Sequence, residues 1–219
     1  KIKKSGRLLG TDAQITIFSD SKEKGEIVLD KCFNEAKKLE SMFSLYKNDS
    51  LISQINEYGE IHNYPNQFRE LLETALKFSK ISNGAFDITV QPLWKFYEDF
   101  YTNNNNPNKV IKDSEIKNVL KKVDYKKVFI ENKKIFFRDK NMSITLNGIA
   151  QGYITDKVTE ILANFGISKT LVNMGEYRAL GSKNNGEDWK IGIVNPDQTW
   201  SISKILPIQN MSVATSGGY

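Results

Sequence analysis

The sequence has little of what cysteine or histidine chemistry needs. It holds one cysteine and one histidine in 219 residues, so a disulfide within the chain is excluded. Cys32 stands among Val28, Ala36 and Leu39 at helical spacing, which favours a buried structural thiol over a nucleophile or ligand. His62 has no cysteine or second histidine nearby to form a zinc site, and we interpret it as a surface-loop residue.

Long apolar runs are also missing. No stretch approaches the roughly 18 to 20 apolar residues of a membrane-spanning helix. The opening Lys1-Ile-Lys-Lys-Ser5 lacks the apolar stretch of a signal peptide, so the chain is expected to be soluble. It ends on the turn-like Thr215-Ser-Gly-Gly-Tyr219 with nothing after it to close a helix or strand, and a continuation is expected there.

The chain carries a modest excess of positive charge. There are 31 basic and 26 acidic residues, a net charge of +5, and the lysines are scattered among asparagines. This pattern is typical of a solvated surface, and we expect no nucleic-acid partner; salt-dependent oligonucleotide binding would revive that alternative. With 39% hydrophobic residues, the chain is long enough for one substantial domain or two small ones.

Hydrophobic periodicity predicts both helices and strands. Helices are expected from just after Gly25 to Phe43, over 68–79 with a stop at Asn83-Gly84, from Asp113 or Ser114 to Val123, and over 153–165 with a stop at Gly166. Strands are expected over 14–18, 127–130, 134–137, 143–146, 169–173 and 190–194. Residues 102–108 are interpreted as an exposed insertion loop. This order favours an α+β or mixed α/β layered fold with mainly antiparallel pairing.

The most informative local pattern is Leu146-Asn-Gly-Ile-Ala-Gln-Gly-Tyr153, which is predicted to join a strand to a helix through two glycines. Free backbone amides at a helix N-terminus, with the positive end of the helix dipole, suit a phosphate or pyrophosphate. Free carbonyls in the same turn suit a cation. Taken alone, the pattern is explained equally well by glycines that serve packing only.

The same stretch, with Asp156 three residues after it, resembles the Gly-Ile-Ala-Lys-Gly-Tyr-like turn of the ApbE family. Further segments resemble that family's motifs in the same order: 40–46 with 50–56, Gly84-Ala-Phe-Asp-Ile-Thr-Val-Gln-Pro-Leu93, Leu171-Val-Asn-Met-Gly175, Trp189-Lys-Ile-Gly-Ile-Val-Asn-Pro196 and Val213-Ala-Thr-Ser-Gly217. On these ordered matches the chain is identified as a member of the ApbE family.

The resemblance implies a fold and an activity. The fold would be α+β, two-lobed and layered, with mainly antiparallel sheets and flanking helices, and residues 1–219 would form a single ApbE-like flavin transferase domain that lacks its C-terminal part. The activity would be that of an FAD:protein FMN transferase, which uses magnesium to move FMN from its substrate FAD to a Thr or Ser hydroxyl of a target flavoprotein and releases AMP. An FAD pyrophosphatase giving FMN and AMP, and a non-catalytic flavin-binding protein, remain alternatives.

The resemblance also implies roles for single residues. The carbonyl of Ala150 would be one magnesium ligand. The family completes this metal site with an Asp-Ala-x-Ser-Thr-like segment that does not occur in these residues, and no catalytic residue is named. The residues expected to contact FAD are Tyr46, Ala85, Phe86, Asp87, Asn147, Gln151, Tyr153, Asp156, Thr215 and Ser216. Of these, Tyr46 suits aromatic stacking, while Asp87 lies between apolar neighbours and needs paired donors.

Three positions depart from the family pattern. Thr145 stands where an aspartate is usual, Gln151 where a lysine is usual, and Glu176 where a second glycine is usual. Gln151 removes a positive charge that would hold the pyrophosphate, which is expected to weaken FAD binding. Members of the family are typically exported and often lipid-anchored. The resemblance therefore implies an extracytoplasmic protein, periplasmic or at the cell surface, anchored to the membrane through a lipid-bearing N-terminal segment.

Overall fold

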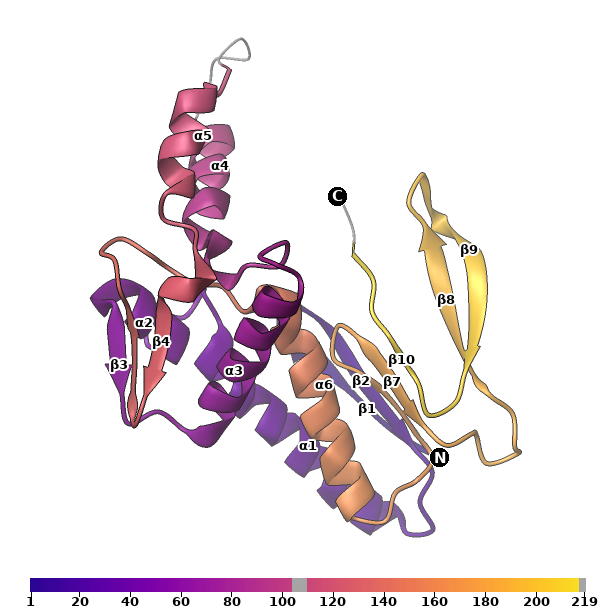
Figure 1. Cartoon of the computed structure of the whole chain (residues 1–219). Coiled ribbons are helices and arrows are strands. Elements are labelled where there is room, and N and C mark those ends of the chain that lie inside the picture. Colours follow the sequence, from indigo (N-terminus) through magenta and orange to yellow (C-terminus); the bar gives the residue numbers. More distant parts are fainter. Residues whose placement is uncertain (104–109, 217–219) are drawn as a thin grey trace. The chain divides into compact units, whose positions relative to one another are not determined.

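The structure is a computed structural model that describes residues 1–103 and 110–216 (Figure 1). The chain divides into two compact units, one formed by Lys1–Glu40 with Gln151–Tyr219 and the other by Ser41–Ala150. Each unit combines helices with a sheet, and the strand pairings are antiparallel. The predicted α+β class with antiparallel sheets is therefore confirmed.

The first unit contains a five-stranded sheet in the order β1-β2-β6-β7-β10. Its strands are β1 (Ile2–Leu8), β2 (Thr11–Ile17), β6 (Thr170–Asn173), β7 (Tyr177–Leu180) and β10 (Ser212–Val213). Alternation along β2 buries Ala13, Ile15 and Ile17, and Val172 of β6, the partner of Ile15, is buried as well. One face of the sheet is thus apolar and must be covered.

Two long helices, α1 (Lys22–Phe43) and α6 (Asn147–Asn164), run beside this sheet (Figure 1). The Cys32 thiol on α1 lies 3.8 Å from the carbonyl oxygen of Val158 on α6 and is fully buried, as its spacing predicted. Gly25 lies within the first turn of α1, and a Cβ there would collide with Ile2 of β1. The prediction that this glycine precedes the helix is therefore wrong, because its missing side chain lets the helix approach the sheet.

A hairpin of β8 (Trp189–Asn195) and β9 (Gln198–Ile208) completes the first unit. Its inward residues Trp189, Ile191 and Ile208 form a small core with Ala179 of β7. The Trp189 indole also donates a hydrogen bond to the carbonyl oxygen of Gly181, at 3.1 Å. The hairpin is therefore fastened to the same strand, β7, that carries residues of the candidate site.

The second unit has a three-stranded sheet in the order β3-β5-β4. Its elements are α2 (Leu51–Tyr58), β3 (Glu60–His62), α3 (Asn66–Ile81), α4 (Gln91–Asn103), α5 (Asp113–Leu120), β4 (Val128–Glu131), β5 (Lys134–Phe137) and short 3-10 turns at Ile88–Val90 and Tyr125–Lys127. The fully buried side chains include Phe68, Leu71, Ile55 and Ile135. They form the core of this unit.

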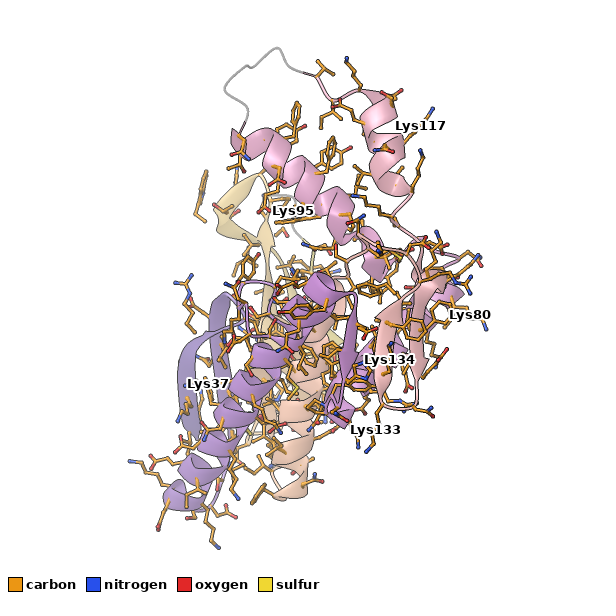
Figure 2. The ribbon with its side chains drawn as sticks, turned by 90° about the vertical axis from the view of Figure 1, so that its left-hand side faces the viewer. Lys37, Lys80, Lys95, Lys117, Lys133 and Lys134 are labelled. Carbon is orange, nitrogen blue, oxygen red and sulfur yellow. The ribbon has the colours of Figure 1, made fainter. Side chains whose placement is uncertain are left out.

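The lysines of the second unit lie on its outside. Figure 2 shows Lys80, Lys95, Lys117, Lys133 and Lys134 spread over α3, α4, α5 and the β4–β5 hairpin. The Lys134 ammonium pairs with the Glu60 carboxylate at 2.6 Å. This scatter fits the expected solvated surface. Within the described part of the chain, no helix is long and apolar enough to cross a membrane.

Several predicted boundaries need correction. The last predicted helix begins at Asn147 rather than Tyr153, and residues 143–146 belong to no sheet. His62 ends β3 instead of lying in a loop, although it is exposed. Thr102 and Asn103 of the expected insertion loop are the end of α4, and the rest of that loop lies outside the described residues.

Candidate functional site

The glycine-containing segment is the first turn of α6, because the helix begins at Asn147. The amides of Ile149 and Ala150 donate to the carbonyl oxygen of Leu146, at 3.0 and 2.8 Å. The amide of Asn147 donates to the hydroxyl of Thr145, at 3.2 Å. The amides of Asn147, Ile149 and Ala150 are thus already paired, and the prediction of free amides in this turn is wrong for these three.

Gly148 is small because an aromatic ring packs against it. A Cβ at this position would lie 3.2 Å from Cε2 of Phe86. Together they contribute to a groove of about 340 Å³ whose other lining residues are Phe78, Ile81, Ser82 and Ile149. The lining is almost wholly apolar, and its volume is in the range of small-ligand sites. Phe86 is therefore at a groove able to take a flat apolar ring.

Asp87 lies beside that groove in sequence, but both its carboxylate oxygens are occupied. Oδ1 accepts from the amide and hydroxyl of Thr89, at 2.8 and 2.6 Å, and Oδ2 accepts from the amide of Tyr125, at 3.0 Å. The prediction that the Asp87 carboxylate requires hydrogen-bond donors is confirmed. The carboxylate holds the turn after Phe86 to the turn before β4, while its direct contact with nucleotide stays a prediction.

Most of the remaining predicted residues of this unit lie at its surface. Tyr46 exposes 83% of its surface, which leaves its ring open to stacking. Ala85 and Asn147 are exposed as well, and Ala150 is buried in α6. Their predicted ligand contacts stay predictions.

In the first unit, the β6–β7 turn gathers several predicted residues from distant parts of the sequence. The side-chain amide of Gln151 lies over Gly175, whose φ of +99° requires a glycine. One helical turn later, the Thr155 hydroxyl donates to the carbonyl oxygens of Gln151 and Glu176, at 2.8 and 3.4 Å. The start of α6 is thereby tied to this turn.

The segment after β10 joins the same turn. The amide of Thr215 donates to Oε2 of Glu176, at 3.2 Å. Burial raises the pKa of the Glu176 carboxyl, and the hydrogen bond from Thr215 partly opposes that rise. Ser216 follows directly in the chain. Gln151 and Thr215 therefore both lie at the β6–β7 turn. The sequence had marked Glu176 only as a departure from the family pattern.

Asp156 contributes through a residue that sequence reasoning missed. Its carboxylate pairs with the guanidinium of Arg178 on β7. The available signal was an arginine inside a short strand of otherwise apolar side chains, Tyr177-Arg-Ala-Leu180. Tyr153 lies on the preceding turn of α6, with the Lys157 ammonium 5.3 Å from its ring centre.

The ApbE family model matches residues 9–219. This chain belongs to the ApbE family. Among curated relatives, it is similar to the FAD:protein FMN transferase of Haemophilus influenzae, at 28% identity over 207 residues that cover 85% of this chain and 56% of the relative. The chain thus spans about half the length of the curated relatives it matches.

Solved ApbE structures share this fold. The flavin transferase ApbE from Vibrio cholerae aligns with a TM-score of 0.84 at 24% identity, covering 99% of this chain and 71% of that one. The ApbE protein from Thermotoga maritima gives a TM-score of 0.84 at 26% identity, with 99% and 70% covered. The predicted ApbE-like fold is confirmed.

The two units of this ApbE chain offer different surfaces. The apolar groove of the second unit suits an aromatic ring, and the polar cluster of the first unit suits a polar group. By contrast, the described residues contain no group of three His, Cys, Asp or Glu side chains that would hold a metal ion. The Ala150 carbonyl lies inside α6, where the first lone pair of such an oxygen serves the helix. One carbonyl alone does not make a magnesium site.

Proposed function

We propose that this ApbE chain is an FAD:protein FMN transferase. The observation that carries the proposal is the family match over residues 9–219, joined by likeness to the flavin transferase from Vibrio cholerae along 99% of the chain. The substrate is FAD, and the partner is a target flavoprotein with an acceptor Thr or Ser hydroxyl.

The proposed reaction exchanges one phosphorus–oxygen bond for another. The acceptor hydroxyl oxygen bonds to the FMN phosphorus, and the bond from that phosphorus to the bridging oxygen of the diphosphate breaks. The bridging oxygen leaves with AMP, and the hydroxyl proton passes to solvent or to the leaving phosphate. Such a reaction depends on positioning and on stabilising charge, which are the tasks that the protein side chains must perform.

Each unit contributes a distinct kind of surface to this proposal. In the second unit, the apolar groove beside Phe86 and Gly148 is suited to an aromatic ring, and exposed Tyr46 to stacking. In the first unit, Gln151, Thr215 and Ser216 offer side-chain amide and hydroxyl groups to a polar part of the nucleotide.

Magnesium dependence is also part of the proposal, supported by the resemblance alone. When bound, the ion would supply charge neutralisation at the diphosphate. Since the described residues contain no group of three His, Cys, Asp or Glu side chains that would hold the ion, no step of the proposed reaction runs through it. We further propose an extracytoplasmic location, periplasmic or at the cell surface, with membrane anchoring; labelling of intact cells with an impermeant reagent tests this.

Product analysis tests the proposal against its two alternatives. The chain is incubated with FAD, magnesium and a flavodoxin-like acceptor, and the products are separated after acid precipitation. Acid-stable flavin fluorescence on the acceptor, with one AMP released per flavin attached, supports transfer. Free FMN and AMP alone identify a pyrophosphatase, and FAD binding without AMP release identifies a non-catalytic flavin-binding protein.

A further inference from the structure

The cluster at the β6–β7 turn contains one arginine, Arg178, most of whose N–H donors are not used in hydrogen bonds within the described residues. A guanidinium carries five N–H donors. Arg178 uses Nη1 for the Asp156 carboxylate, and no other hydrogen-bond partner of its guanidinium occurs within residues 1–103 and 110–216. About 35% of its side chain is accessible to solvent, so a ligand can reach the remaining donors.

Strand register places Arg178 on the same side of β7 as the groups already described. Arg178 is two residues after Glu176, and alternate residues of a strand share a face. It lies opposite Val172 of β6 and Ser212 of β10, three residues before Thr215. Its pairing with Asp156 shows that this face is turned toward α6. The guanidinium therefore stands among the residues gathered at the turn.

The other side chains of that cluster offer no positive charge. Gln151, Thr155 and Thr215 are neutral, and Asp156 and Glu176 are acidic. Lys157 follows Asp156 in α6, but its ammonium lies 5.3 Å from the centre of the Tyr153 ring. Arg178 is therefore the cationic side chain that the β6–β7 turn itself offers to a diphosphate, and arginine suits phosphate oxygens because its planar fork can donate two parallel hydrogen bonds.

We propose that Arg178 binds the diphosphate of FAD, while Asp156 is its ion-pair partner within the fold. The inference rests on the proposed function and deepens it by naming a phosphate contact. Asp156 does not itself touch the nucleotide. A purely structural ion pair between α6 and β7 is the competing interpretation.

Substituting each member of the ion pair in turn tests the proposal, because a structural ion pair and a phosphate site predict different changes in FAD affinity. FAD binding is measured by fluorescence titration for the whole chain and for the variants Arg178→Gln and Asp156→Asn. Loss of Arg178 should raise Kd about ten- to a hundred-fold, the range for a lost hydrogen bond to a charged group. Asp156→Asn leaves the guanidinium in place and frees it from a competing carboxylate. It should bind FAD within about five-fold of the unchanged chain, the worth of a half-exposed ion pair.

Thermal unfolding separates stability from binding. Both variants lose the same ion pair, so their midpoints should fall by similar amounts while their FAD affinities diverge. Arg69→Gln is the matched control, because Arg69 pairs with Glu73 at 2.7 Å on the exposed face of α3 and its loss should leave the Kd unchanged.

Equal weakening of FAD binding in both variants of the pair would overturn the assignment, and so would an Arg178→Gln chain that binds like the unchanged one. If Arg178→Gln does not fold, Arg178→Lys takes its place, because it keeps the charge but not the planar fork: FAD binding weakened more than about five-fold supports the assignment, and unchanged binding contradicts it. An unchanged chain that binds no FAD at all would instead remove the proposed function, and this inference with it.

Discussion

The side-chain amide of Gln151 lies against Gly175, with Nε2 only 2.7 Å from the place that a Cβ at position 175 would occupy. Gln151, in α6, therefore packs on the β6–β7 turn. This contact joins two of the family-like segments, the one that ends at Tyr153 and the one that ends at Gly175.

Replacing Gly175 by alanine should therefore destabilise the chain and displace Gln151. The left-handed backbone alone costs about 1–2 kcal/mol for a residue with a Cβ, and the clash with the amide adds to it. Chemical denaturation measures the loss. Gly152→Ala is the matched control, since Gly152 lies inside α6 with open space where its Cβ would be. It should stabilise by about 0.5–1 kcal/mol, and equal losses in both variants would contradict this explanation.

Asp87 should matter to stability before it matters to ligand binding. Asp87→Ala removes the acceptor for Thr89 and Tyr125 and should cost about 2 kcal/mol, as expected for a lost cap with unpaired donors. Asp87→Asn keeps one carbonyl oxygen and should cost less. Denaturant midpoints of the two variants check this order. A fully stable Asp87→Ala chain would show that the hydrogen-bonded turn does not depend on the carboxylate.

Glu176 gives a pH dependence of known sign. Because burial raises its pKa above the ordinary value of 4.5, the folded chain holds the proton more readily than the unfolded chain does. The stability that this contributes is present below pH 4.5 and is lost as the pH rises through the folded pKa. Glu176→Gln should thus gain thermal stability relative to the unchanged chain as the pH rises from 4 to 7.

Glu187 provides the control of opposite sign. Hydrogen bonds from Asn185 and Lys183 hold the pKa of the Glu187 carboxyl below its usual range. Its contribution is present above the ordinary pKa and is lost as the pH falls, so Glu187→Gln should lose relative stability toward neutral pH. Two glutamine variants with parallel pH profiles would contradict the opposite assignments.

Cys32 should be inert in the folded chain. Burial raises the pKa of its thiol to about 12, so almost no thiolate exists at neutral pH. A colorimetric thiol reagent should label it only as fast as the chain opens, and immediately in denaturant. Rapid labelling of the native protein would show that the packing between α1 and α6 is looser than described.

The sequence predicted elements well where an apolar stripe is continuous and less well elsewhere. The stripe from Val28 to Phe43 is an example, and α1 does run to Phe43. The helix α4 was missed although Trp94, Tyr97 and Tyr101 stand at helical spacing; none of its described residues is buried, so this stripe packs into no core. Two glycines, Gly25 and Gly148, were interpreted wrongly from the sequence. Close packing against a neighbouring side chain, rather than a turn of the chain, explains why these positions hold glycine.

Pairings between distant segments could not be read from the sequence. The family-like motifs marked Gln151, Asp156 and Thr215 separately. Nothing in their spacing indicates that Glu176 would bind the amide of Thr215, or that Arg178 would pair with Asp156 across 22 residues. Such contacts depend on the register of β7 between β6 and β10, which only the folded chain defines.

The most direct measurement of the central claim is the intact mass of an acceptor flavoprotein before and after incubation with this chain, FAD and magnesium. Transfer predicts that the acceptor mass rises by one FMN phosphoryl group, that the change maps to a Thr or Ser, and that AMP appears in equal amount. An acceptor of unchanged mass, in a mixture where FAD is bound or split to FMN and AMP, would contradict the transferase assignment.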